Sequence, residues 1–156
     1  MATTSQLATL QAVRTRLLTW NSNAIKTALG TLSGAGSDGK LYIDQAPDSV
    51  TYPYGVLRMA DWREQGDDGG FARRCEVELH LVTRPRTNAS ALKTIADHCE
   101  RALRAWVDVS AGAIVARRGL TRGTVLYEEP ADREVVLERL LIPLYVHPTY
   151  HTQDSA

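Results

Sequence analysis

Tyr54-Gly-Val-Leu-Arg-Met-Ala60 and Cys75-Glu-Val-Glu-Leu-His-Leu-Val-Thr83 are the two stretches that decide the fold. Apolar and polar side chains alternate in both, which is the pattern of a β-strand with one covered face and one wet face. In the second stretch the covered face would carry Cys75, Val77, Leu79 and Leu81, and the wet face Glu76, Glu78 and His80. Two such runs in succession predict an antiparallel hairpin.

Residues 61–74 join the two runs and are rich in charge and glycine, so they predict a long hairpin loop. A loop of this length in a compact domain usually has a function. It carries two aromatic residues, and exposed aromatics are common anchors for a protein partner. The alternative is that both rings fold back over the sheet. The interface residues predicted in this segment are Trp62, Arg63, Asp67, Asp68, Phe71, Arg73 and Arg74.

Before the hairpin, apolar residues recur at helical spacing and predict an amphipathic helix that begins after Thr3 or Thr4. These residues are Leu7, Leu10, Val13, Leu17, Leu18 and Trp20. The segment Asn21–Asn23 either ends this helix or caps a short second one, Ala24–Leu29, which Gly30 would stop. A short strand is expected at Leu41–Asp44.

After the hairpin, a second amphipathic helix is predicted, capped by Thr87 or Asn88. Its apolar face would carry Leu92, Ile95, Ala96, Cys99, Ala102, Leu103 and Trp106. Strands are expected at Ile114–Arg118 and Val125–Tyr127, around a glycine-rich turn, and at Val135–Val146. Pro143 predicts an edge, a bulge or the end of that last strand. A polar tail is expected at about residues 147–156.

The order helix, strands, helix, strands predicts a single α+β domain over residues 1–156. Its sheet would be mixed or mainly antiparallel, with the two main helices packed on one face and a long β-hairpin loop. Cys75 and Cys99 fall on apolar faces, so both are expected to be buried free thiols. We see no signal peptide and no membrane span, so folding in a reducing cytoplasm is expected.

No catalytic, cofactor or metal site is predicted. The segment Gly34–Lys40 matches the start of a phosphate-binding loop, but Leu41 stands where that motif needs Ser or Thr, so a linker is favoured. The four histidines lack the spacing of a metal site. The acidic residues from Glu128 to Glu138 are expected to form a solvated turn and strand face rather than an acid–base pair.

The balance of charge also bears on partners. Lys plus Arg (18) equals Asp plus Glu (18), and a net charge of zero argues against a dedicated nucleic-acid binder. It also weakens the electrostatic repulsion between copies of the chain. Arginine far outnumbers lysine, which favours a protein interface, and Arg117 and Arg118 are the candidates outside the hairpin.

Two local segments carry a resemblance to a known family: Asp44-Gln-Ala-Pro47 with Tyr52-Pro-Tyr54, and the join from Thr83-Arg-Pro85 into the second helix. Together with the order of elements over residues 5–147, they resemble the tail terminator (tail completion, minor tail) proteins of long-tailed bacteriophages. The resemblance implies a homo-hexameric ring that caps the head-proximal end of the tail tube. Such a ring stops tube polymerisation and provides the joint to the head–tail connector.

The same resemblance implies a virion protein that is assembled in the cytoplasm of the host bacterium and is not an enzyme. Its partners would be itself, the tail tube protein and a neck protein, with DNA only passing through the lumen. It implies no cofactor, no catalysis and no membrane contact.

A ring closes only when two complementary patches meet. We expect the acidic stretch that includes Glu128 and Glu129 to face arginines of the next subunit, either those at 73 and 74 or those at 117 and 118. Three other interpretations stay open. They are another neck or connector protein, a small-molecule-binding α+β domain or enzyme, and a dimeric interaction module.

Overall fold

The structure is a computed structural model that describes residues 6–30, 39–48, 50–64, 73–84, 89–104, 106–108, 113–116, 121–129 and 133–147. Its helices are α1 (Gln6–Leu29) and α2 (Ala89–Leu103). Its strands are β1 (Leu41–Ile43), β2 (Tyr54–Glu64), β3 (Arg73–Thr83), β4 (Val107–Asp108), β5 (Ala113–Ala116), β6 (Thr121–Glu129) and β7 (Arg133–His147).

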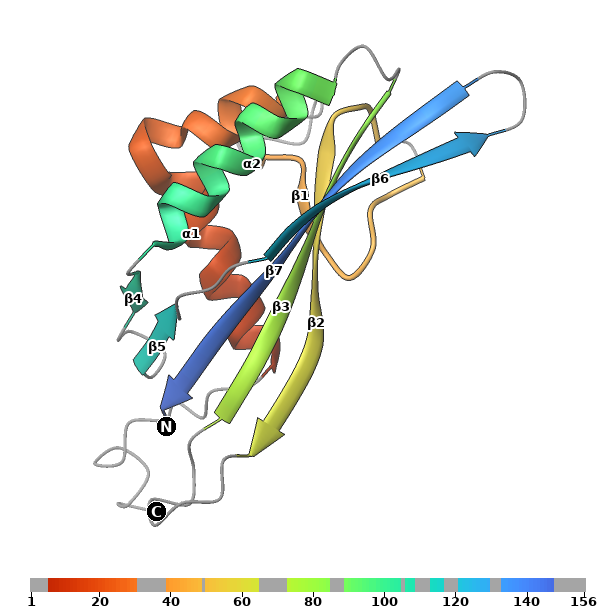
Figure 1. Ribbon diagram of the computed structural model, residues 1–156. Helices are drawn as coiled ribbons and strands as arrows, with labels where there is room; N and C mark the ends of the chain where they lie inside the picture. Colours follow the sequence, from red (N-terminus) through yellow and green to blue (C-terminus); the bar gives the residue numbers. More distant parts are fainter. Residues whose placement is uncertain are drawn as a thin grey trace.

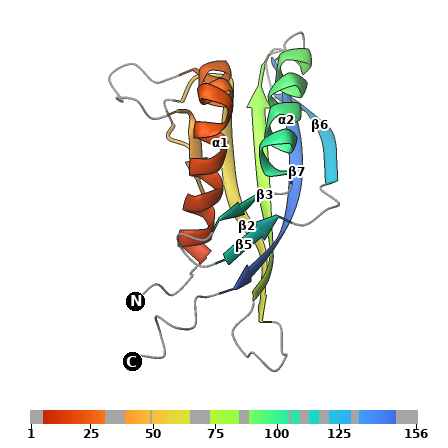
Figure 2. The same ribbon diagram turned by 90° about the vertical axis from the view of Figure 1, so that its left-hand side faces the viewer.

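The described strands form one mixed sheet in the order β1-β2-β3-β7-β5-β4, and β6 also pairs with β7. Only the β1–β2 pair is parallel, and the other described pairs are antiparallel. Both helices lie on the same face of the sheet, as Figures 1 and 2 show. The predicted α+β fold with two helices on one face is therefore confirmed.

The helix α1 has a break at the position that the sequence indicated. Trp20 to Asn23 have non-helical backbone angles, and the helix resumes through Ile25 to Leu29. It ends at Gly30, whose φ of 80° lies in the left-handed region. The amide of Gly30 donates a hydrogen bond to the carbonyl oxygen of Lys26 over 3.0 Å. None of the described helices is long and apolar enough to cross a membrane.

The predicted second helix is α2, but it ends earlier than its apolar pattern suggested. The helix stops at Leu103, and Trp106 lies beyond it. The amide of Trp106 instead donates to the carbonyl oxygen of Leu103 over 3.3 Å, which is a tighter turn than an α-helix. Trp106 is nevertheless buried at 8% exposure. Its burial was predicted correctly, and its helical conformation was not. The expected caps at 87 and 88 lie outside the described residues.

The predicted hairpin is present, but both strands extend into the segment that was predicted as loop. β2 continues to Glu64 and β3 begins at Arg73, so only residues 65–72 lie outside the described part of this hairpin. The register shifts between Met59 and Asp61. A bulge of this kind inserts one extra residue and then lets the alternation resume, so apolar side chains on both sides of it face the core.

Of the three alternatives predicted for Pro143, a bulge and the end of the strand were wrong, and an edge describes it locally, because one side of β7 is unpaired there among the described residues. Pro143 pairs with Glu76 of β3 and lies inside the strand, which continues to His147. On the other side of β7, β6 pairs up to Leu141 and β5 pairs from Leu144 onward. Pro143 therefore falls in the gap between these two partners, where a residue without an N–H is best tolerated.

Smaller differences concern the ends of the C-terminal strands. β6 begins at Thr121, inside the expected glycine-rich turn, and β5 ends at Ala116, before the expected Arg118. β4 was not predicted, and it is short. His147 is the last residue of β7 rather than part of the tail, and residues 148–156 lie outside the described part.

The core lies between the two helices and the sheet. From β3 it takes the predicted face of Cys75, Val77, Leu79 and Leu81, each at most 3% exposed. Both cysteines are buried free thiols, as predicted. Burial raises the pKa of the Cys75 and Cys99 thiols to about 12, so both stay protonated near neutral pH.

Candidate interaction surface

One face of the sheet is not covered by either described helix, since both helices lie on the other side of the strands in Figure 1. We call it the outer face. Strand register places on it, from β2, β3 and β7, Tyr54, Val56, Arg58, Glu76, Glu78, His80, Val82, Leu137, Arg139, Leu141 and Tyr145. An uncovered sheet face with apolar and charged residues is a candidate surface for a protein partner.

The end of the outer face near the start of β2 is apolar. Val82 and Leu137 are each 8% exposed and form a small cluster of their own with Tyr52 and Tyr54. The two tyrosine rings lie 5.6 Å apart between centroids. The guanidinium carbon of Arg84 lies 4.6 Å from the centroid of the Tyr52 ring, within the range of a cation–π contact.

The middle of the outer face is charged, and Glu78 pairs there with two side chains of the same chain. Glu78 hydrogen-bonds His80, and Arg139 Nε lies 2.9 Å from Glu78 Oε1. Burial favours a higher pKa for Glu78, but the contacts with His80 and Arg139 outweigh it and lower the pKa. Glu78 therefore stays ionised to a lower pH than an unpaired glutamate, and it links His80 on β3 to Arg139 on β7.

The predicted hairpin residues fall into three groups. Trp62 lies on the inner face, partly buried against the core, so the alternative in which it covers the sheet describes it correctly. Arg63 and Arg74 are exposed on the outer face, and Arg63 Nε lies 2.8 Å from Asp61 Oδ2. Asp67, Asp68 and Phe71 lie outside the described residues, and of Arg73 only the strand backbone is described.

The acidic and basic residues predicted to meet across the ring lie beside opposite ends of β7. Glu128 and Glu129 lie in β6, where their backbones pair with Glu134 and Arg133 of β7. Arg74 pairs with Tyr145 at the far end of β7. At about 3.3 Å per strand residue, these ends of β7 are roughly 35 Å apart within one subunit. The arginines at 117 and 118 lie outside the described residues.

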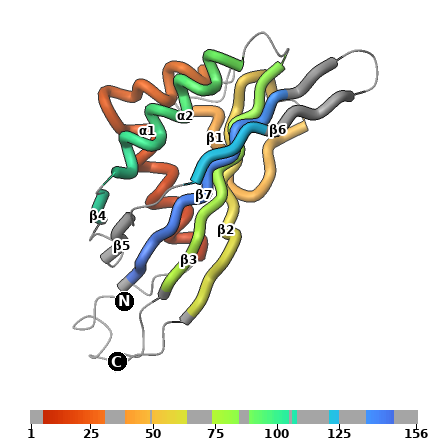
Figure 3. Tube along the Cα trace, in the orientation of Figure 1, coloured from red at the N-terminus to blue at the C-terminus, as the bar shows by residue number. Residues whose placement is uncertain are grey.

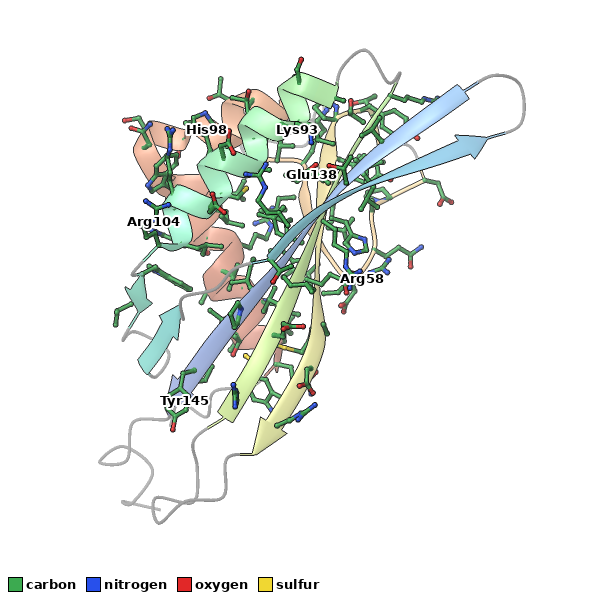
Figure 4. The ribbon with its side chains drawn as sticks, in the orientation of Figure 1. Arg58, Lys93, His98, Arg104, Glu138 and Tyr145 are labelled. Carbon is green, nitrogen blue, oxygen red and sulfur yellow. The ribbon has the colours of Figure 1, made fainter. Side chains whose placement is uncertain are left out.

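A buried charge cluster was missed by the sequence analysis. Glu138 was expected on a solvated face, but it is 3% exposed on the inner face of β7. It accepts a hydrogen bond from Thr124 Oγ1 over 2.7 Å, and Arg122 Nη2 lies 3.3 Å from its other oxygen. Lys93 Nζ on α2 lies 3.6 Å away, and Figure 4 shows Lys93 and Glu138 close together.

Arg122 extends this cluster to the helix. Its Nη1 lies 2.5 Å from Asp97 Oδ1 and 3.8 Å from Glu100 Oε2, both on α2. The hydrogen bond from Arg122 is the main reason that the pKa of Asp97 is lowered. The cluster therefore ties β6 to both β7 and α2. The signal that could have found it is the position of Glu138 on the apolar face of an alternating strand, between Val136 and Leu140.

Lys40, the last residue of the glycine-rich segment Gly34–Lys40, makes hydrogen bonds that stabilise the fold. Lys40 is 5% exposed, and its Nζ donates to the carbonyl oxygen and to Oγ1 of Thr51 over 3.2 and 3.1 Å. Burial lowers the pKa of Lys40. Residues 34–38 lie outside the described part. Within the described part, no group of three or more His, Cys, Asp or Glu residues is placed to hold a metal ion.

Comparison with known proteins places this fold in a family. Residues 11–138 match the family model described as tail completion protein gp17. The chain belongs to this family. A tail completion protein is a structural component of a phage-like virion, so this chain has a structural role in the tail. The resemblance to tail completion proteins that the sequence indicated is confirmed.

The same fold occurs in a solved virion. The chain is similar to a chain in the virion of the native gene transfer agent particle, with 19% identity and a TM-score of 0.57. The match covers 92% of this tail completion protein and 99% of the other chain. At this identity the match shows a shared fold. No protein in the curated set matches the chain.

The buried cluster predicts a difference between two substitutions. Arg122→Ala would leave Glu138 buried with only Thr124 and Lys93, and we expect a loss of about 2–4 kcal/mol in the free energy of unfolding. Glu138→Gln keeps the shape and one acceptor oxygen for Arg122, and the hydroxyl of Thr124 can turn to accept from the new amide, so it should cost less, about 1–2 kcal/mol. Urea denaturation followed by circular dichroism measures both, with exposed Arg101→Ala on α2 as the control. An Arg122→Ala protein as stable as the control would show that the cluster does not hold β6.

Proposed function

We propose that this tail completion protein is the terminator of its tail. It forms a homo-hexameric ring at the head-proximal end of the tail tube, stops tube polymerisation and provides the joint to the neck. The family match over residues 11–138 carries this proposal. The tail tube is a stack of subunits with an open end. A ring built from several copies can cover that end and present a different surface to the neck.

Features of the chain support a ring of this kind. The sheet ends on both sides in strands with an unpaired edge among the described residues, and neither described helix covers its outer face (Figure 1). A subunit in a ring uses two different surfaces, one toward each neighbour, and a further surface for the tube or the neck. The zero net charge fits a lumen through which DNA passes without being held.

A second candidate is another protein of the head–tail neck, since it would share the virion location. It would not end tube growth, so the length of the tails separates the two roles.

The role as terminator predicts a defect in tail length. Particles produced without this protein should contain heads that are not joined to tails and tubes of irregular, mostly greater length, because nothing ends polymerisation. Electron microscopy of lysates from a deletion strain measures both. Supplying the protein from a plasmid is the control and should restore joined particles of one length. Unjoined tails of normal length would favour the neck role instead.

The hairpin tip predicts a second, separable defect. Deleting Gly66 to Gly70 shortens the connection between β2 and β3 beyond the strand ends, so the fold should remain and the joining of tails should be lost. Thermal unfolding reports the fold, and the yield of infectious or DNA-transferring particles reports joining. A matched control replaces the same residues with a Gly/Ser segment of equal length. Normal particle yield from the deletion variant would exclude the tip as a docking element.

The acidic and basic patches predict an effect of charge on assembly. If Arg117 and Arg118 meet the acidic stretch of the next subunit, Arg117→Glu with Arg118→Glu should weaken ring formation, and lower salt should not rescue it. Analytical ultracentrifugation measures the association. The control is the pair Arg117→Lys and Arg118→Lys, which keeps the charge. Rings that form normally in the Glu variant would remove this pair from the contact.

A further inference from the structure

The side of α1 that points away from the sheet carries no charged residue. Its exposed positions before the break in the helix are Gln6, Leu7, Gln11, Thr15 and Thr19, which we call the α1 face. Leu7 is 54% exposed, an unusual value for a large apolar side chain in this fold. A helix face that meets water normally carries charged residues. Depletion of charge on an exposed face is instead typical of the core of a protein interface.

The neighbouring helix does not share this property. α2 lies beside α1 on the same side of the sheet, as Figure 3 shows. Its exposed positions include Lys93, Asp97 and Arg101, so its outward side carries charges of both signs. Threonine is also a weaker helix former than the residues that usually fill a solvated helix face. The composition of the α1 face therefore fits contact with another surface better than contact with water.

The arginines in this part of α1 are turned to its flanks. The Nε of Arg14 donates to the carbonyl oxygen of Leu41 on β1 over 2.6 Å, and the Nε of Arg16 donates to that of Ala102 on α2 over 2.7 Å. Both side chains are partly buried. Between Gln6 and Leu29 the helix contains no acidic residue. The α1 face is therefore an uncharged surface between two basic flanks.

The outer face of the sheet contains a matching surface. Leu141, Pro143 and Tyr145 follow one another along the outer side of β7 and are each partly exposed, and we call them the β7 strip. Strand register places two acidic residues of β3 beside it, Glu78 next to Leu141 and Glu76 next to Pro143. Sheets in folded domains are normally covered by helices or by another sheet. An uncharged helix face with basic flanks fits an apolar strip with acidic neighbours.

The two surfaces lie on opposite sides of the subunit. α1 is on the helix side of the sheet, and the β7 strip is on the outer face, so one chain cannot bring them together (Figure 1). A contact between them joins two different surfaces of two copies. Such a contact repeats from copy to copy, and it closes into a ring when a rotation relates successive copies.

The positions of the two surfaces decide the direction of the ring axis. Arg14 binds Leu41 of β1, and strand register places Leu41 level with Glu138 of β7. From there Pro143 is about 16 Å further along the strands, and β7 is three strand spacings, about 14 Å, across the sheet. The two offsets are similar. An axis in the plane of the sheet, inclined at roughly 45° to the strands, therefore relates the two surfaces by rotation without a shift along the axis.

We propose that the α1 face of one copy packs on the β7 strip of the next copy, with a basic flank of α1 near Glu76. The occupant is a second copy of this chain, because one contact then covers both surfaces in every subunit. This inference rests on the proposed ring and names the contact that closes it. It places the junction between subunits on the two sides of the sheet rather than at the hairpin tip.

Cysteine cross-linking in assembled particles tests the contact. Thr15→Cys on the α1 face is combined in turn with Leu141→Cys, Pro143→Cys and Tyr145→Cys. The native thiols are buried, so they should not take part. Mild oxidation of the purified particles should give, for at least one pair, a ladder of linked copies that ends at the ring size. The control is Thr94→Cys, at an exposed threonine of α2, with the same β7 cysteines, and it should give no ladder.

A second variant measures strength in place of proximity. Thr15→Arg changes an exposed position to a better helix former, so the isolated subunit should keep or gain thermal stability. In the contact it buries a charge against the apolar strip, so assembly should weaken. The concentration of added protein that restores half of the particle yield to a lysate lacking it should rise about tenfold or more. Thr94→Arg on α2 is the matched control and should leave that concentration unchanged.

The possible outcomes separate this contact from the proposed function. Particles that assemble normally but give no ladder with any of the three β7 cysteines would overturn the contact and leave the terminator role intact. A product that stops at the dimer with Thr15→Cys alone would mean that α1 pairs with α1 and would also overturn it. A full ladder in a strain whose tails keep normal length without the protein would support the contact and reject the terminator role.

Discussion

The pairing of β3 with β7 is the constraint on which the rest of this protein depends. The two strands pair from Arg73 with Val146 to Thr83 with Val136 without a shift of register. Because side chains alternate between the two faces of a sheet, this single ladder decides which residues of both strands face the helices. A slip by one residue would bring Glu76, Glu78 and His80 into the core, so the buried apolar face fixes the register strongly.

The parts of the fold that a simple period describes could be predicted from the sequence. The inward face of β3 and the apolar stripe of α2 follow periods of two and 3.6 residues, and both are buried as expected. The break in α1 could be predicted as well, because Asn21 and Asn23 are residues that leave a helix readily. The ends of elements were less predictable. The bulge at residue 60 hides the continuation of β2, since Trp62 resumes the alternation one residue late.

The candidate surface could be predicted only in part. The family resemblance rests on short local segments, so the sequence alone is enough to indicate it. The open edges depend on strand order, and no local pattern says that β7 lies between β3 and β6. Glu138 shows the same limit on a smaller scale. A carboxylate in a strand is expected to face solvent, because burying it without partners is costly. The partners of Glu138, Arg122 and Lys93, come from distant parts of the chain, so a local pattern does not reveal them.

The burial of the two thiols has a consequence for the life of the particle. Tail proteins are made in a reducing cell, but the finished virion is released into oxidising surroundings. A thiol reacts with oxidants as the thiolate, and with pKa values near 12 Cys75 and Cys99 hold almost none of it. Both also lie in the core, where their sulfur atoms are shielded from solvent. The two thiols therefore stay reduced in both environments, and the fold outside the host is held by packing, hydrogen bonds and ion pairs rather than by a disulfide.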